Sequence, residues 1–151
     1  MEIERKYLVS TLPEDLEDFP HVEIEQGYLC TSPTLRIRRM GDAYILTVKE
    51  RVVSATSAIV NREEEFTLAP ESYRRLKTKC EGKMVCKTRY RIPLTGGLTA
   101  ELDLFHSAHE GLRLVEVEFP DTVAAEEFVP PTWFGEDVSG DPHYRNSYLS
   151  Q

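Results

Sequence analysis

Charged side chains of a single sign recur at every second position in several segments of this chain, and this alternation constrains the fold most. Alternate side chains of an extended strand point to opposite faces. Each such segment therefore has one charged face and one largely apolar face. The charged positions are Glu2, Glu4 and Lys6; Arg36 and Arg38; Lys49; Glu63 and Glu65; Lys87, Arg89 and Arg91; Glu101 and Asp103; and Glu116 and Glu118.

The alternating segments and the turn residues between them predict eight strands. We expect these at 2–9, 22–31, 34–40, 43–51, 61–68, 83–93, 98–106 and 112–120, with a loop over 52–60. Helical spacing predicts a helix over 71–80 that ends at Gly82, and a second over 122–128 with Asp121 as its N-cap. A last turn is expected near 144–149. This is the pattern of a single mainly β (α+β) domain spanning 1–151, an antiparallel barrel or sandwich.

The grouping of the charges favours a closed barrel over a sandwich. Solvated strand faces usually mix signs, whereas here like charges come as pairs and triples, which repel at close range. A closed eight-stranded antiparallel barrel with a charged lumen would bring basic and acidic strands face to face, and it would leave no exposed sheet edge. The apolar faces would then point outward, against the helices and loops.

The charged lumen indicates a chemistry. Seven basic residues face it in this hypothesis: Lys6, Arg36, Arg38, Lys49, Lys87, Arg89 and Arg91. Arginine binds phosphate oxygens in bidentate fashion and lysine adds a point charge, so this many cations suit a polyphosphate. The carboxylates are suited to Mg²⁺ or Mn²⁺, which prefer oxygen ligands. A metal that bridges carboxylates and phosphate would support phosphoryl transfer.

An ordered set of motifs resembles a known family, the CYTH domains or triphosphate tunnel metalloenzymes, in their short bacterial type. The N-terminal Glu2-x-Glu4-x-Lys6 is similar to that family's ExExK signature. The set continues through LRIR at 35–38, TVK at 47–49, EEE at 63–65, KTRYR at 87–91, ELDLF at 101–105 and VEVEF at 115–119. The resemblance implies an eight-stranded tunnel that binds a triphosphate together with divalent metal ions.

The resemblance also implies roles for single residues. Glu2, Glu4, Glu116 and Glu118 would be metal ligands, with Asp103, Glu63 and Glu65 assisting; Arg36, Arg38, Lys49, Lys87 and Arg89 would bind phosphate oxygens. Lys6 would orient or activate the attacking water, or balance charge on the leaving group. Tyr28 is either a partner of Lys6 or a tyrosine packed at a strand end. A slip of one residue would put Glu64 inside, but Glu63 and Glu65 are preferred because Phe66 and Leu68 then share the apolar face. The family often has glycines before the fifth strand, where this chain has SATSAIVN. Near the C-terminus, Tyr144-Arg145-Asn146 would either close one mouth of the tunnel, as the resemblance allows, or serve in capping and packing.

The expected activity is a metal-dependent triphosphatase that hydrolyses inorganic tripolyphosphate, a small-molecule triphosphate. The alternatives on the same fold are a class IV adenylate cyclase, a thiamine triphosphatase or a nucleoside triphosphatase. A non-catalytic polyphosphate-binding module is an alternative of a different class. Phosphate release from several triphosphates would separate these hypotheses.

Composition sets limits on partners. The net charge of −8 argues against broad nucleic-acid binding. No apolar run approaches the roughly 20 residues of a membrane helix, so no membrane association is expected. The start of the chain does not resemble a signal peptide, and the odd number of cysteines without a CxxC pair favours reduced thiols in a cytoplasmic protein, with no zinc site. The oligomeric state is expected to be a monomer or homodimer.

Overall fold

The chain forms a closed antiparallel β-barrel with one additional strand and three short helices. The structure is a computed structural model that describes residues 1–151 except 54 and 57. Its strands are β1 (Glu2–Val9), β2 (His21–Thr31), β3 (Thr34–Met40), β4 (Ala43–Val52), β5 (Ile59–Thr67), β6 (Glu81–Pro93), β7 (Thr99–Phe105), β8 (Arg113–Glu118) and β9 (Phe134–Asp137). The helices are α1 (Pro70–Lys77), α2 (Thr122–Glu127) and α3 (Asn146–Leu149).

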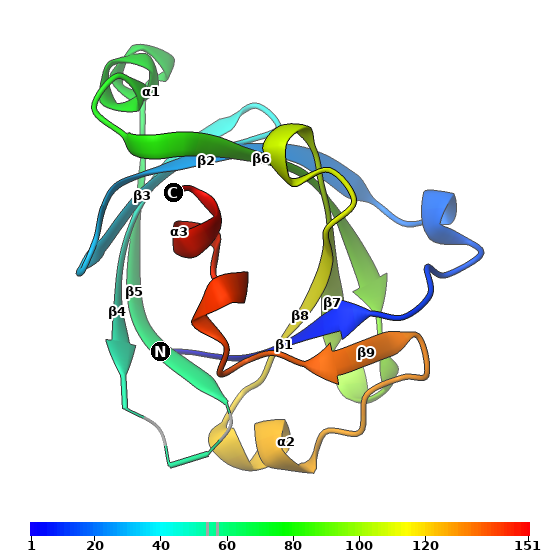
Figure 1. Ribbon diagram of the computed structural model, residues 1–151. Helices are drawn as coiled ribbons and strands as arrows, with labels where there is room; N and C mark the ends of the chain where they lie inside the picture. Colours follow the sequence, from blue (N-terminus) through cyan, green and yellow to red (C-terminus); the bar gives the residue numbers. More distant parts are fainter. Residues whose placement is uncertain (54, 57) are drawn as a thin grey trace.

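Strand pairing closes the barrel. The hydrogen-bonded order is β5-β4-β3-β2-β6-β7-β8-β1, and β5 also pairs with β1. Seen along its axis, the wall therefore makes a complete ring (Figure 1). The predicted eight-stranded closed barrel is confirmed, with strand boundaries that differ by up to a few residues. The predicted loop over 52–60 is shorter, because β4 extends to Val52 and β5 begins at Ile59; positions 54 and 57 within it lie outside the described residues.

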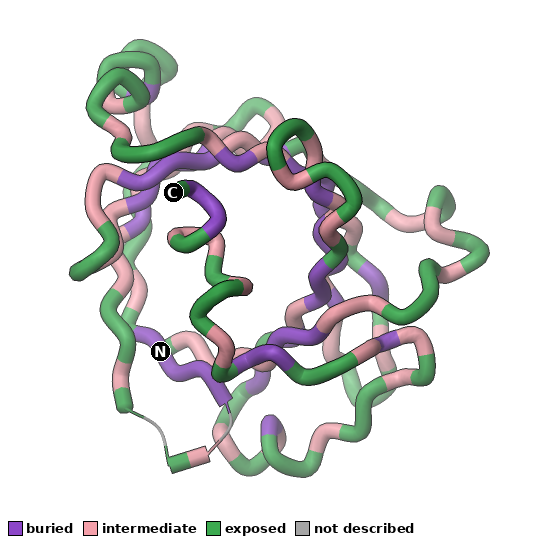
Figure 2. Tube along the Cα trace, in the orientation of Figure 1, coloured by how far each residue is buried: buried purple, intermediate pink, exposed green. Residues whose placement is uncertain are grey.

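The main hydrophobic core lies outside the barrel wall. Tyr7, Leu102, Val115 and Val117 are buried on the outer face of their strands, where α2 and the segment around β9 cover them. Figure 2 shows buried positions following the wall, while the covering segments are mostly exposed or half-buried. This arrangement follows from the charged lumen: the apolar faces need a partner, and only elements outside the ring can supply it. The expectation that apolar faces point outward is confirmed.

Strand β9 was not predicted. Its four residues pair with the second half of β1, where Val9 lies opposite Phe134. The ring of Phe134 lies 5.0 Å from that of Tyr7 and 4.6 Å from that of Trp133, measured between centroids. This aromatic packing holds an extra strand on the barrel.

The C-terminal tail turns back into the barrel. It comprises a 3₁₀ turn at Pro142–Tyr144 followed by α3, which Figure 1 shows inside the ring. Leu149 and Val138 pack against Val85, Phe105 and Leu114, an apolar cluster at one end of the lumen. We call this end the tail end of the lumen. The predicted last turn near 144–149 is thus present, and it fills one end of the barrel.

Helix α1 stands on the outside of the barrel (Figure 1). It begins with Pro70, a residue favoured in the first turn because its missing N–H needs no partner there. Tyr73 anchors the helix by donating a hydrogen bond of 2.8 Å to Glu25 Oε1. The helix ends at Lys77, earlier than predicted, and Gly82 is part of β6.

Two further observations concern the described part of the chain. Cys30, Cys80 and Cys86 are free thiols. None of the described helices has the length and apolarity needed to cross a membrane.

Candidate active site

The lumen changes in polarity from one end to the other. Three of its strands show the change: β1 presents Glu2, Glu4, Lys6 and then Leu8; β8 presents Glu118, Glu116 and then Leu114; β6 presents Arg89, Lys87 and then Val85. Carboxylates thus surround one mouth, cations occupy the middle and apolar residues close the tail end. The charged part encloses a cavity of about 720 Å³, within the range of small-molecule sites.

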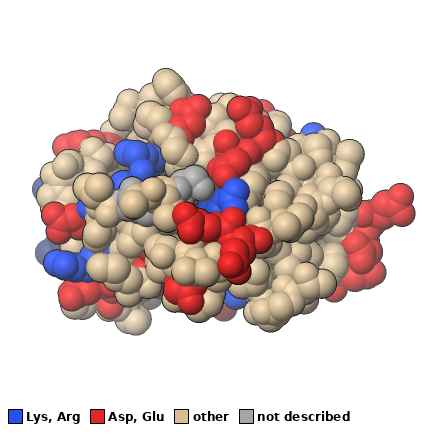
Figure 3. All heavy atoms as spheres, turned by 90° about the horizontal axis from the view of Figure 1, so that it is seen from below, with Lys and Arg blue, Asp and Glu red and all other residues tan. Residues whose placement is uncertain are grey.

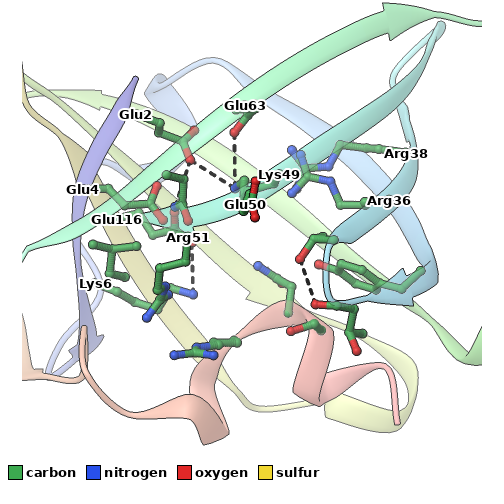
Figure 4. A pocket seen from close by; sticks show the side chains of 18 of the residues that line it. Glu2, Glu4, Lys6, Arg36, Arg38, Lys49, Glu50, Arg51, Glu63 and Glu116 are labelled. Carbon is green, nitrogen blue, oxygen red and sulfur yellow. Dashed lines mark hydrogen bonds and ion pairs between the residues drawn. The ribbon is translucent and has the colours of Figure 1, made fainter. Parts of the chain in front are cut away.

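The acidic mouth is formed by Glu2, Glu63, Glu65 and Glu118, beside Met1. Two of these carboxylates hold one lysine: Lys49 Nζ lies 3.0 Å from Glu2 Oε1 and 3.3 Å from Glu63 Oε2, as Figure 4 shows. Burial and the charge of Arg36 both act to lower the pKa of Lys49. The surrounding glutamates outweigh these two effects, so the pKa of Lys49 is raised. The register predicted for 63–65 is confirmed, because Glu63 and Glu65 line the cavity.

Glu4 and Glu116 form a second pair of carboxylates deeper in the lumen. Burial, followed by the charges of Glu116 and Glu2, raises the pKa of Glu4 well above its usual value. Glu116 is buried as well, but the charges of Lys6, Arg89 and Lys87 hold its pKa well below the usual range. The Lys6 ammonium lies 3.4 Å from Glu116 Oε1. Glu116 therefore ionises more readily than Glu4, which binds a proton more tightly.

Cations crowd the middle of the lumen. Arg36, Arg38 and Arg89 are buried and, with Lys49, line one cavity. Burial and the charges of Arg36 and Arg89 lower the pKa of Arg38 to about 9. The Nε of Arg36 is buried and has no hydrogen-bond partner among the described residues. Buried polar groups in folded proteins nearly always have a partner, so this arrangement calls for an anion with several oxygen acceptors.

Asp103 organises two of the cations. Its carboxylate accepts hydrogen bonds of 2.8 and 2.9 Å from Arg89 Nε and Nη2, and Lys87 Nζ lies 2.7 Å from Oδ2. Burial lowers the pKa of Lys87 to about 7, although Asp103 opposes this change. Neither Lys87 nor Asp103 lines the cavity. The geometry therefore differs from the expected roles: Asp103 holds cations in place of a metal, and Lys87 supports the wall in place of contacting phosphate.

Two further expectations are corrected. Arg91 does not line the cavity; its side chain is 57% exposed and pairs with Glu101 at 2.9 Å. It lies near the end of β6, beyond the cavity. Tyr28 does line the cavity, but its hydroxyl accepts a hydrogen bond of 3.4 Å from Gln26. Lys6 contacts Glu116 and the carbonyl of Tyr144 instead, so the described contacts do not pair Lys6 with Tyr28.

Several cavity residues were not predicted as site residues from the sequence. Arg51 at the end of β4 and the tail residues Ser139, Arg145 and Asn146 all line the cavity. Arg51 continues the alternation of Thr47 and Lys49, and this signal was available in the sequence. Ser139 carried no such signal, and Arg145 and Asn146 were expected only to close a tunnel mouth or to serve in capping and packing, because their exact position depends on the tail folding back into the barrel.

The carboxylates fit a divalent cation that takes part of its coordination from substrate. Among the described residues, no three His, Cys, Asp or Glu side chains lie close enough together to hold a metal ion. They do form two neighbouring pairs, Glu2 with Glu63 and Glu4 with Glu116, in which each carboxyl affects the pKa of its partner or is affected by it. Mg²⁺ commonly binds through one or two carboxylates plus phosphate oxygens and water, and this donor set fits that mode.

Comparison with known proteins identifies the family. The model of the CYTH domain matches residues 1–128. The chain belongs to the CYTH domain family. It is 40% identical over 153 residues to an inorganic triphosphatase of Nitrosomonas europaea, covering 99% of this chain and 96% of that protein. It is 34% identical to an inorganic triphosphatase of Acetivibrio thermocellus, covering 98% and 92%. A crystal structure of an inorganic triphosphatase superposes with a TM-score of 0.72 at 38% identity, covering 99% of this chain and 94% of that one.

Proposed function

We propose that this CYTH domain is a divalent-metal-dependent inorganic triphosphatase that hydrolyses tripolyphosphate to orthophosphate and pyrophosphate. The observation that carries the proposal is the group of buried cations, with the unpartnered Nε of Arg36 among them, facing paired carboxylates in one cavity. The relatives at 40% and 34% identity that bear the name inorganic triphosphatase support the choice of substrate.

The cavity residues supply positioning and charge. Arg36, Arg38 and Arg89 bind oxygens of the phosphate chain, which removes their mutual repulsion. As the water oxygen bonds to the terminal phosphorus, the anhydride P–O bond breaks and its electrons remain on pyrophosphate. Lys6 orients that water or balances charge on the leaving group. Glu2, Glu4, Glu63, Glu116 and Glu118 would hold Mg²⁺ or Mn²⁺, with help from Glu65. When bound, the metal would neutralise phosphate charge.

A substrate panel tests this proposal. Phosphate release is measured from tripolyphosphate, ATP and thiamine triphosphate, each with Mg²⁺, with Mn²⁺ and with EDTA. We expect the highest kcat/KM with tripolyphosphate and a divalent metal, and no activity in EDTA. Inactivity toward all three substrates, together with tight binding of polyphosphate, would support a binding module instead. Formation of cyclic AMP as the main reaction would support a cyclase.

The site assignment has its own test. Arg38→Ala removes a buried phosphate ligand, and loss of such a preorganised donor costs on the order of a hundredfold or more in kcat. Arg62→Ala is the matched control, because Arg62 is exposed on β5 and does not line the cavity. Near-normal turnover in Arg38→Ala would remove this residue from the site.

A further inference from the structure

Two arginines of the cavity have no role in the assignment above. Arg51 at the end of β4 and Arg145 in the tail both line the cavity, and Figure 4 shows Arg51 pointing into it. Both residues are exposed to solvent. Within the part of the chain that the structure describes, neither guanidinium makes a hydrogen bond or an ion pair. Both belong to the lining of one cavity, and burial together with the charge of Arg145 lowers the pKa of Arg51, while the charge of Glu4 opposes this change.

The fold holds both arginines in place. Arg51 lies on the lumen side of a strand, two positions beyond Lys49, and its neighbour on β5 is Asn61. Arg145 lies between two tail residues that lumen lysines hold: Lys6 Nζ donates to the carbonyl of Tyr144 at 3.0 Å, and Lys87 Nζ donates to Asn146 Oδ1 at 3.2 Å.

The tail carrying Arg145 is also anchored beyond these contacts. Leu149 is buried in the apolar cluster at the tail end, and the carbonyl of Ser150 accepts a hydrogen bond from the amide of Lys83. Arg145 is thus presented on a backbone fixed on both sides. Two guanidiniums that line one cavity and make no ion pair with any described residue form a site for an anion.

We propose that Arg51 and Arg145 form a clamp for one end of a linear polyphosphate, while Arg36, Arg38 and Arg89 bind the rest of the chain. The proposal rests on the function proposed above and specifies its substrate class. Glu4 lies near Arg51, and Glu116 lies beside Glu4, so carboxylates accompany the clamp as well as the middle of the lumen. A linear chain of phosphates offers separate oxygens to both groups of cations within this one cavity. The clamp therefore favours tripolyphosphate and longer chains over pyrophosphate and orthophosphate.

The experiment measures binding separately from hydrolysis. The Kd values of tripolyphosphate and pyrophosphate are determined by calorimetry without divalent metal for the wild type, Arg51→Gln, Arg145→Gln and the double variant. Arg113→Gln, an exposed arginine outside the cavity, is the matched control. Removing one charge-assisted contact should weaken tripolyphosphate binding about tenfold or more, with a smaller effect on pyrophosphate. Because both arginines act on the same phosphate group, their effects should not be independent. The fold-loss of tripolyphosphate affinity in the double variant should therefore differ from the product of the fold-losses in the two single variants.

Further readouts exclude a merely structural effect. Arg51→Lys and Arg145→Lys should recover part of the affinity, and thermal unfolding should be unchanged in all variants. In turnover assays the Gln substitutions should raise KM by a larger factor than they lower kcat. Tripolyphosphate binding within twofold of wild type in both Gln variants would overturn the clamp, even if the enzyme hydrolyses tripolyphosphate. Weakened binding in a protein that hydrolyses no triphosphate would support the clamp and refute the proposed function.

Discussion

Replacing Asp103 with asparagine should unfold the barrel more easily, because it leaves two buried cations without their shared anion. Asp103 is 2% exposed, and its oxygens contact both Arg89 and Lys87 within 3 Å. Removing one partner from a buried charge network costs about 3–5 kcal/mol. For a domain of this size each kcal/mol lowers Tm by about 2–4 °C, so the melting temperature should fall by about 6–20 °C.

The assay is urea denaturation followed by circular dichroism, with Asp137→Asn as the control. Asp137 pairs with Arg5 at 2.8 Å, but its side chain is 31% exposed, so its loss should cost at most about 1 kcal/mol. Although burial opposes it, the charges of Arg89 and Lys87 lower the pKa of Asp103 below its unfolded value. Its stabilisation is therefore present above about pH 4 and is lost as the pH falls through the folded pKa. The difference in the free energy of unfolding between the wild type and Asp103→Asn should therefore become smaller at acidic pH. A difference below about 1 kcal/mol at pH 7 would refute the reasoning.

Three further substitutions test other parts of the molecule. Glu4→Gln should lower kcat about a hundredfold in a phosphate-release assay, yet leave the free energy of unfolding unchanged or higher at pH 7, because the raised pKa means that ionised Glu4 destabilises the fold. A substantial loss of stability in this variant would contradict that account. Gly82→Ala should loosen the tail, seen as faster hydrogen exchange there, because Gly82 has a φ of +66° and an added Cβ would collide with the carbonyl of Ser150. Unchanged exchange would argue against this contact. Tyr73→Phe removes the hydrogen bond to Glu25 and should cost about 0.5–1.5 kcal/mol in urea denaturation; an equally stable variant would show that α1 needs no such anchor.

The sequence predicted the barrel because one physical rule governs most of it. Alternation in strands assigns each side chain to the lumen or to the outside, and like charges on one face exclude a solvated sheet. That rule placed Glu63 and Glu65 inside and left Glu64 out of the cavity, as observed. It also extends to Arg51, two positions beyond Lys49, although the prediction ended at the recognised motif.

The remaining features depend on depth along the barrel axis, which alternation does not give. Lys87 and Arg91 share a face with Arg89, yet the first is buried behind the cavity and the second lies in solvent. Strand β9 and the tail are short segments without periodicity, and their positions follow from surfaces that exist only after the barrel has closed. The tail contact of Lys6 therefore had no detectable signal, and for Arg145 the resemblance suggested only a place at a tunnel mouth.

The acidic mouth of the lumen has a consequence for how fast substrate is captured. Glu2, Glu63, Glu65 and Glu118 surround it. A free polyanion diffusing toward this rim meets its own sign of charge, while the deeper cations act only within a Debye length of about 8 Å at physiological ionic strength. Added salt, which slows most electrostatically steered encounters, should here speed the encounter step by screening the rim. A polyanion already neutralised by a divalent cation should pass the rim fastest.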